Sequence, residues 1–463
     1  MTGIADLPAA EDDLGITRRT PIFVRPELTL DDRLVEFVHR SKFRSLAQST
    51  RESYALDVRL LLSYLSHSGI DWVDASLDDL ESYEHWRRRH QDNPLRISGA
   101  KWSRERAAIQ LLYSWASARG IVRNDPAAGL AQPRDVRSAR VRWLTPRALS
   151  QWKRVGLTGY QANGLRDPDW DSLVDDRNMA MVDLLYASGM RIREAGSLFM
   201  TEVPAGDDGA RLPGMSSGFI AAACAKGRRR RQFWITASAL SSIEAYVTTS
   251  RRFAVRKANQ GGRYDQAADM RLVRSHARST GVISFTERDG REGRITVDAI
   301  APAERSRYYR EGVDGIEPLL LWLDASGRPV RYRHWTENVF PSANQRCAQL
   351  GLTLHCTPHM CRHSFALRML VALEYALSTR AGMTPEERRR EDLLLGSPFD
   401  LVRDLLGHAS TTTTRKHYLE PLAGLRVEHL LGNGDDDDLH RIIARIAERS
   451  PMIQDHDPDG VPA

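Results

Sequence analysis

The sequence has few cysteines, few lysines and no long apolar run, and each scarcity narrows what the protein can be. Its 463 residues include four cysteines without the paired spacing of a disulfide framework, so we expect a reducing, cytoplasmic setting. No stretch approaches the roughly 18 apolar residues of a membrane helix. The polar, acidic opening residues also differ from a secretory signal. We therefore expect neither export nor a membrane partner.

Lysine is rare because only six of the 66 basic residues are lysine and the other sixty are arginine. A guanidinium grips phosphate oxygens two at a time, but abundant arginine can equally reflect the codon usage of a GC-rich genome. With a net charge of only +6, composition by itself indicates a polyanionic partner weakly. The sequence contains neither the G-x-x-x-x-G-K-[ST] phosphate loop nor an H-E-x-x-H zinc motif, so we expect no cofactor and no metal.

The length predicts two or three domains, and changes in composition suggest where they meet. We expect a flexible arm at 1–28, an all-helical domain at 29–132, an arginine-rich linker at 133–144, a larger mixed domain at 145–432 and an acidic tail with a short helix at 433–463.

Local signals predict mostly helices with a few strands. Ser49 and Glu52 have the spacing of a capping box that would open a long amphipathic helix. Two segments are typical of hairpins, "GFIAAACAKGRRRRQFWIT", which turns near Lys226, and "GVISFTERDGREGRITV", which turns at Asp289. The predicted fold is therefore mainly α with a small β-sheet.

Arg191 lies in the first segment that could carry chemistry, "LLYASGMRIREAGSL". Ser188 and Gly189 break one helix there and the next begins at once, so Arg191 is expected in its first turn. Unpaired backbone N–H groups and the helix dipole favour an anion at that end of a helix. Taken alone, such an arginine is more often solvated or paired with an acid.

The second segment is "TPHMCRHSFALRML", where Thr357 can cap a helix that Pro358 opens. His359 and Arg362 then lie three residues apart on one helical face, which places a proton-transfer group beside a fixed positive charge. A competing metal-site interpretation would use His363 with Cys356 or Cys361, but the spacing matches no known ligand set.

The third segment is "LLGHASTTTTRKHYLEP". Gly407 and His408 close an apolar helix, and Tyr418 follows as the last tyrosine of the chain. Any tyrosine nucleophile in this region must therefore be Tyr418, although a lone tyrosine is usually a packing residue.

The order of these residues resembles the tyrosine recombinase (phage integrase) family, whose catalytic set is Arg, Lys, His-x-x-Arg, His or Trp, and Tyr. The resemblance covers roughly residues 30–430, with "TPHMCRHSFA" and "LLGHAS" as its most specific boxes, and "LLLWLDASGRPVRYRHW" resembles the family's segment before the His-x-x-Arg box. It implies a catalytic set of Arg191, Lys226, His359, Arg362, His408 and Tyr418.

The resemblance also implies an activity and a fold. A member of this family would cleave and rejoin duplex DNA through a 3′-phosphotyrosine intermediate, without metal or ATP. The helical segment would be a core-binding domain that closes a two-domain clamp on DNA with the catalytic domain. Backbone contacts would come from Arg228, Arg229, Arg230 and Arg231 in the hairpin and from Arg137 and Arg140 in the linker.

The chain departs from the family pattern in two ways. The family's usual interval of nine residues from the second histidine to the tyrosine would end on His417, whereas Tyr418 is ten residues from His408. We also expect insertions near 258–318 and 376–398, neither of which interrupts a catalytic box.

Partners follow from the same resemblance. We expect double-stranded DNA, a homo-tetramer during synapsis, accessory DNA-bending or directionality proteins, and a cytoplasmic, nucleoid-associated location, as for DNA integration by a mobile element. Two alternatives stay open at this point: a type IB topoisomerase, which shares the chemistry, and a catalytically inactive DNA-binding protein of the same fold.

Overall fold

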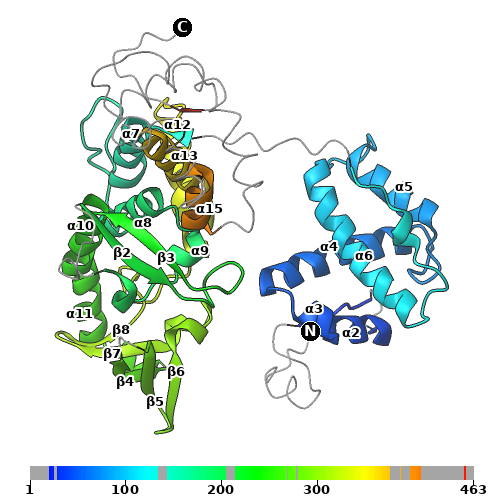
Figure 1. Ribbon diagram of the computed structural model, residues 1–463, viewed down its shortest axis with the longest axis horizontal. Helices are drawn as coiled ribbons and strands as arrows, with labels where there is room; N and C mark the ends of the chain where they lie inside the picture. The colour runs from blue at the N-terminus through cyan, green and yellow to red at the C-terminus, as the bar shows by residue number, and fades with distance from the viewer. Residues whose placement is uncertain are drawn as a thin grey trace. The chain divides into compact units, whose positions relative to one another are not determined.

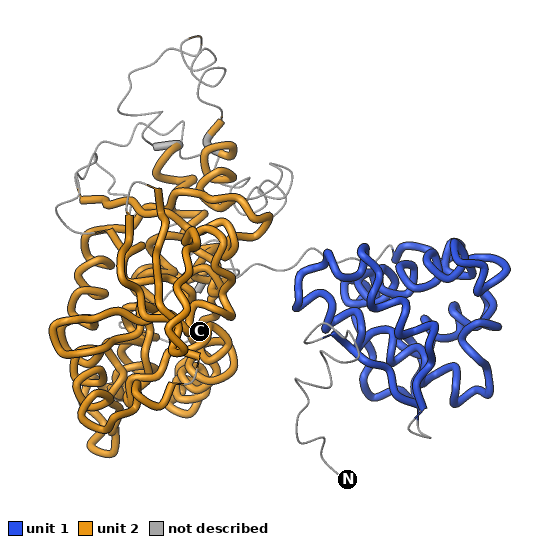
Figure 2. The backbone as a smooth tube through the Cα atoms, turned by 90° about the horizontal axis from the view of Figure 1, so that it is seen from below, with its two compact units in different colours: residues 1–138 blue, residues 139–463 orange. Residues whose placement is uncertain are grey.

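The protein was analysed as a computed structural model, whose chain divides into two compact units, residues 1–138 and 139–463 (Figure 2). Each unit has its own buried apolar core. The structure describes residues 20–25, 29–133, 143–204, 214–267, 269–277, 280–375, 386, 397–407 and 453–454. Most of the predicted arm, linker and tail, and the predicted insertion near 376–398, lie outside these residues.

Apart from an isolated bridge between Val24 and Leu30, the regular secondary structure of the first unit's described residues is helical. Its helices are α2 (Asp32–His39), α3 (Ser41–Arg44), α4 (Gln48–His67), α5 (Leu77–Arg88) and α6 (Gly99–Ala118), followed by the short turn η1 (Pro126–Gly129) (Figure 1). The long helices α4 and α6 pack against each other, and Leu61, Trp102 and Tyr113 between the helices are fully buried. This burial of aromatic and aliphatic surface is what holds the unit together.

The helix start predicted for this unit differs from the one in the structure. The capping box predicted at Ser49 is wrong, because α4 already begins at Gln48 and the Glu52 carboxylate accepts a hydrogen bond from the Gln48 side chain at 2.9 Å. A true box opens α5, where the Asp79 N–H donates to Ser76 Oγ at 3.3 Å and the Ser76 N–H donates to Asp79 Oδ2 at 2.8 Å.

The described part of the predicted arm is packed rather than free. Within residues 20–25, Phe23 packs against the apolar core and the Arg25 guanidinium donates to Asp31 Oδ2 at 2.9 Å. Asp31 is buried, so this ion pair fixes the segment on the unit. The expectation of a flexible arm over 1–28 is therefore wrong for these residues, because an apolar contact and a buried acid tie them down.

The second unit is built around α8 (Asp175–Ser188), which packs against α7, α10 and α13. Its other helices are α7 (Pro146–Thr158), α9 (Ile192–Ala195), α10 (Ala237–Tyr246), α11 (Arg252–Gln260), α12 (Phe340–Gln349), α13 (Pro358–Tyr375) and α15 (Pro398–Leu406). Thr145 caps α7, because its hydroxyl accepts the Ala148 N–H at 3.1 Å. Mostly helical units with small sheets confirm the predicted fold class.

The strands of the second unit form separate small sheets. β2 (Met215–Ile220) and β3 (Arg231–Thr236) make the first predicted hairpin, and β1 (Trp143–Leu144) pairs in parallel with β9 (Ile453–Gln454). A five-stranded sheet has the order β6-β5-β4-β7-β8, with β4 (Arg271–Ala277), β5 (Val282–Glu287), β6 (Glu292–Thr296), β7 (Tyr308–Gly312) and β8 (Gly315–Pro318).

The five-stranded sheet lies within the segment predicted as an insertion, residues 258–318. The predicted turn at Asp289 is confirmed, since β5 and β6 are antiparallel neighbours and Gly290 has the left-handed φ of +86° that such a turn uses. Figure 1 shows this sheet at one end of the unit, with α7, α12 and α13 at the other. Ile283, Phe285 and Tyr308 of the sheet pack into the same apolar core as the helices, and the assignment of the segment as an insertion stays a prediction.

A buried charge cluster joins three helices of the first unit. The fully buried Glu105 carboxylate of α6 accepts from Arg87 Nη2 of α5 at 2.7 Å, and Lys101 Nζ lies 2.8 Å from it and 2.5 Å from Asp57 of α4. Burial alone would raise the pKa of Glu105, but hydrogen bonds from Arg87 and Lys101 lower it below the ordinary value. Glu105 is therefore ionised in the folded protein.

We predict that Glu105→Ala destabilises the first unit by about 3 to 5 kcal/mol, because it leaves Arg87 buried without its counter-charge. The surface change Glu36→Ala, which removes exposed pairs with Arg40 and Arg119, should cost no more than about 1 kcal/mol. Amide hydrogen exchange in α5 and α6 measures both. A carboxyl whose pKa is lowered by folding gives its full stabilisation at a pH above the pKa of the unfolded chain. The difference in stability between the natural chain and Glu105→Ala should therefore shrink as the pH falls below 4.5. Equal exchange in the two variants would contradict the prediction.

Candidate active site

Arg191 is placed by the sharp end of α8. Gly189 ends the helix with a left-handed φ of +63°, and a Cβ there would lie 2.3 Å from the Phe365 ring of α13. Only glycine therefore allows both the turn and the close approach of α13. Arg191 caps the four-residue helix α9 instead of lying in its first turn as predicted, and its guanidinium Nη2 donates to the Gly407 carbonyl at 3.3 Å.

The helix α13 presents the predicted His-x-x-Arg pair. Thr357 Oγ1 accepts the Met360 N–H at 3.2 Å, which confirms the predicted cap. Arg362 is buried, with 3% of its surface exposed, and His359, one turn before it, is exposed to solvent. The His359 ring packs edge-on against His363 with 4.1 Å between centroids. One helix therefore offers a buried cation beside an accessible imidazole.

Arg362 connects two chain segments that lie far apart in the sequence. Its Nη1 donates to the Gly189 carbonyl and its Nη2 to the Leu406 carbonyl, both at 2.6 Å. Leu406 is the last residue of α15, and Gly407 follows it with a φ of +63°. Arg191 and Arg362 thus bind consecutive carbonyl groups, at Gly407 and Leu406, at the point where the chain enters the His408 segment.

Glu194 is the residue that the sequence analysis missed. Its carboxylate, 1% exposed, accepts from the Arg191 backbone N–H at 2.8 Å, from Arg191 Nη1 at 3.1 Å and from Arg231 Nη2 at 2.6 Å. Burial would raise the pKa of this carboxyl, but the charges of Arg231 and Arg191 lower it, so the group is ionised. The signal was present in the sequence as an arginine followed three residues later by a glutamate at a helix start.

Arg231, predicted to contact DNA with its three neighbours, turns inward in the structure. Its side chain at the start of β3 is 12% exposed, and its Nη1 donates to the Leu405 carbonyl at 2.7 Å while Nη2 binds Glu194. Burial lowers the pKa of this guanidinium, and the Glu194 charge opposes that effect. A run of four arginines in a sequence gives no indication of which one turns inward, so the structure alone separates Arg231 from its neighbours.

Lys226 lies in the connection between β2 and β3, residues 221–230, which we call the Lys226 loop. Its side chain is exposed, and Gly227 beside it has a φ of +87°. Arg228 and Arg229 are exposed as well, whereas Arg230 stacks over the Phe219 ring at 4.4 Å. The loop therefore presents several cations to solvent next to the buried Arg231.

Four predicted residues lie outside the described part of the chain, namely His408, Tyr418, Arg137 and Arg140. The described residues bring Arg191 and Arg362 together around Gly407, immediately before His408. They also attach β3, which follows the Lys226 loop, to the same cluster through Arg231 and Glu194.

The competing metal interpretation gains no support from the described residues, among which no three His, Cys, Asp or Glu side chains are placed to hold a metal ion. The Cys356 and Cys361 sulfurs lie 3.5 Å apart and both residues are fully buried. Burial raises the pKa of the Cys356 thiol well above its ordinary value, which favours a neutral, packed thiol over a thiolate ligand.

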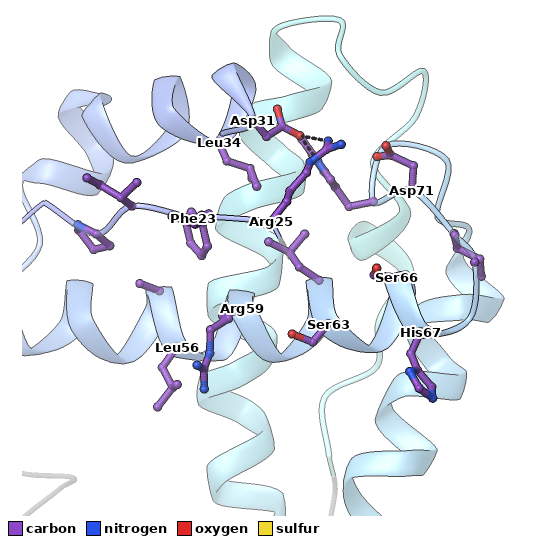
Figure 3. Close-up of a pocket in the computed structure, with 18 residues that line it drawn as sticks. Phe23, Arg25, Asp31, Leu34, Leu56, Arg59, Ser63, Ser66, His67 and Asp71 are labelled. Atoms are coloured by element: carbon purple, nitrogen blue, oxygen red, sulfur yellow. Dashed lines mark hydrogen bonds and ion pairs between the residues drawn. The ribbon is translucent and has the colours of Figure 1, made fainter. Parts of the chain in front are cut away.

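A hollow of about 840 Å³ in the first unit contains none of the predicted site residues. Figure 3 shows it between the segment of Phe23 and Arg25 and the helix that carries Leu56, Arg59 and Ser63. Arg25 and Asp31, which form an ion pair, both line it. Within the described residues, no helix is long and apolar enough to span a membrane.

Comparison with known proteins agrees with this arrangement. The profile of the phage integrase N-terminal SAM-like domain matches residues 37–120, and that of the phage integrase family matches residues 168–372. The second match includes Arg191, Lys226, His359 and Arg362. The chain therefore belongs to the tyrosine recombinase (phage integrase) family.

The proteins to which this chain is similar are recombinases, and the similarity covers most of each chain. The chain is 24% identical to tyrosine recombinase XerC of Roseiflexus sp. (strain RS-1), over 83% of this chain and 88% of the relative. It is 23% identical to tyrosine recombinase XerD of Mycobacterium tuberculosis (strain ATCC 25618 / H37Rv), over 84% and 92%. Among solved structures, the XerH recombinase bound to its difH substrate after cleavage has a TM-score of 0.48 at 15% identity, covering 87% of this chain and 86% of that one.

The protein is accordingly a site-specific DNA recombinase, an enzyme that cleaves and rejoins DNA. The two alternatives left open by the sequence, a type IB topoisomerase and an inactive DNA-binding protein, are not favoured by these matches.

We predict that Glu194→Gln lowers DNA cleavage by about 10²-fold or more, because an amide cannot neutralise Arg191 and Arg231 and its NH₂ opposes their N–H groups. Cleavage of a labelled DNA site measures this at a temperature well below unfolding. Glu317→Gln is the matched control, since Glu317 pairs with the buried Arg251 elsewhere in the unit. Both variants should lose stability, but only Glu194→Gln should lose cleavage. A similar cleavage defect in the control would show that Glu194 acts through stability alone.

Proposed function

We propose that Tyr418 attacks the scissile phosphate of duplex DNA and forms a 3′-phosphotyrosine link, releasing a 5′ hydroxyl. The observation that carries this proposal is the convergence of Arg191 and Arg362 on the carbonyls of Gly407 and Leu406. Two guanidinium groups held by separate helices meet there, at the entrance to the segment that contains His408 and Tyr418. The covalent link conserves the energy of the broken bond, so the reaction needs neither ATP nor a metal.

Arg191 and Arg362 are proposed to hold the non-bridging oxygens of the phosphate as negative charge develops on them. Glu194 holds the backbone N–H and the guanidinium of Arg191, and two carbonyls hold the guanidinium of Arg362, before substrate arrives. Donors preorganised in this way act without reorganisation during the reaction, and removal of one costs about 3 kcal/mol of transition-state stabilisation.

We propose that His359 and Lys226 transfer the protons of the reaction. A phenol has a pKa near 10, so only about one in a thousand is ionised at pH 7 and attack requires removal of its proton. His359, exposed on α13, is proposed to assist that transfer, and His408 to add a hydrogen bond to the phosphate. Lys226 is proposed to protonate the departing 5′ oxygen, a role that lysine can perform and arginine cannot.

DNA binding is proposed to use both units as a clamp on the duplex. Arg228, Arg229 and Arg230 of the Lys226 loop would contact the DNA backbone, as would Arg137 and Arg140 of the linker. Strand exchange requires four cleavage events, so we propose a homo-tetramer on DNA, accessory DNA-bending or directionality proteins, and a location on the nucleoid.

We predict that Tyr418→Phe binds DNA as tightly as the natural chain but forms no covalent adduct, because the ring loses only its nucleophilic oxygen. The assay traps protein on a nicked suicide substrate and separates adducts on a denaturing gel. His417→Phe is the matched control, since His417 occupies the family's usual interval from His408, and it should still form adduct. Adduct formation by Tyr418→Phe would refute the assignment of the nucleophile.

We also predict that deletion of residues 433–463 impairs assembly on paired sites more than cleavage of a single site. Of this tail the structure describes Ile453–Gln454, which pair in parallel with β1. The proposal is that the tail helix near 439–449 docks on a neighbouring protomer. Sedimentation of the protein with one or two DNA sites, beside single-site cleavage, measures the difference. Equal loss of both would count against a role in assembly.

A further inference from the structure

Asp298 supplies most of the hydrogen bonds that attach the Lys226 loop to the segment predicted as an insertion, beside a longer contact of Cys224 Sγ with the Ile300 carbonyl at 4.0 Å. The Ala222 N–H donates to Asp298 Oδ1 at 3.0 Å and the Ala223 N–H donates to the Asp298 carbonyl at 2.9 Å. Arg230 Nη1, at the other end of the loop, lies 3.4 Å from Asp298 Oδ2. One aspartate therefore contacts the chain both where it enters the loop and where it leaves.

Asp298 is itself held rigidly. It lies in the short turn η5 (Val297–Ala299), and the flanking residues Val297 and Ile300 are buried. The guanidinium of Arg305, 1% exposed, donates to the Val297 carbonyl at 3.2 Å and to the Ile300 carbonyl at 3.3 Å. Arg305 is in turn neutralised by Glu202, which belongs to the helical core. The turn that presents Asp298 is thus fixed to the core from both sides.

The opposite end of the Lys226 loop is fixed to the arginine cluster. Arg231, the residue directly after the loop, binds Glu194 and the Leu405 carbonyl. Between these two anchors Gly227 and Arg228 both have positive φ, +87° and +53°. Arginine rarely adopts a positive φ. The contacts at the two ends of the loop therefore hold its backbone in a conformation that the free loop would rarely populate.

We propose that Asp298 is a positioning residue for Lys226, and that the inserted segment 258–318 serves to hold the Lys226 loop over the site. The proposal rests on the proposed role of Lys226 as the general acid. In that step the tyrosine oxygen forms a bond to phosphorus, the bond from phosphorus to the 5′ oxygen breaks, and the lysine ammonium gives its proton to that oxygen. A lysine delivers the proton only if its backbone holds it within reach of the leaving atom.

The test compares two DNA substrates that differ in one atom. A substrate with sulfur in place of the bridging 5′ oxygen leaves as a thiolate, whose conjugate acid has a pKa of about 8.5, so it needs no proton from the enzyme. Asp298→Ala should cleave the ordinary substrate on the order of 10- to 100-fold more slowly, below the ceiling that a general acid supplies. It should cleave the sulfur substrate at nearly the natural rate.

Three further variants complete the experiment. Asp289→Ala is the matched control, because Asp289 lies at the exposed β5–β6 turn of the same insertion and pairs only with Arg291 among its described ion pairs; it should cleave both substrates normally. Asp298→Asn keeps an acceptor for the Ala222 N–H and should stay closer to the natural rate than Asp298→Ala. Lys226→Ala should cleave the ordinary substrate very slowly and the sulfur substrate at nearly the natural rate.

The outcomes separate this inference from the proposed function. If Lys226→Ala is not restored by sulfur, the general-acid role of Lys226 is wrong. If Lys226→Ala is restored but Asp298→Ala is equally slow on both substrates, Asp298 supports the fold and does not position the lysine. Natural rates for Asp298→Ala on the ordinary substrate would also overturn the proposal, as would an Asp298→Asn defect as large as that of alanine.

Discussion

The buried carboxylate of Glu194 is the charge on which the arrangement of the site depends. Arg191 and Arg231 come from different elements and would repel each other in a region shielded from water. A single ionised acid between them offsets that repulsion and satisfies donors from both, as buried ion pairs require. Because Arg231 also binds the Leu405 carbonyl, the same carboxylate sets where α15 ends relative to Arg191.

Close packing at two glycines makes this arrangement sterically possible. Gly189 lies against the Phe365 ring and Gly407 lies against the Arg231 side chain, where a Cβ would be 2.9 Å from Arg231 Cδ. Both glycines also end a helix in the left-handed conformation, so each combines a sharp turn with a close contact. The ends of α8 and α15 can therefore approach the two arginines that bind their carbonyls.

Arginine has two uses in this chain, which explains why composition is a weak guide to function. Arg251, Arg305 and Arg362 are nearly fully buried and donate to backbone carbonyls, so they join elements of the fold. The planar guanidinium suits that task because it directs several donors at once. Arg228 and Arg229, in contrast, are exposed beside Lys226. Arginines of one charged run therefore differ in role, because Arg231 joins elements of the fold and Arg228 and Arg229 face solvent.

The sequence by itself determined the family, the mainly helical fold and the two hairpins, and it predicted Arg191, Lys226, His359 and Arg362 as a set. It could do so because caps, turn residues and motif order are local in the chain. Only the tertiary structure decided that Arg231 points inward, that Glu194 neutralises Arg231 as well as Arg191, and that Asp298 holds the Lys226 loop. These facts depend on burial and on contacts between residues far apart in the sequence. The charge of a residue and its spacing from its neighbours do not specify either.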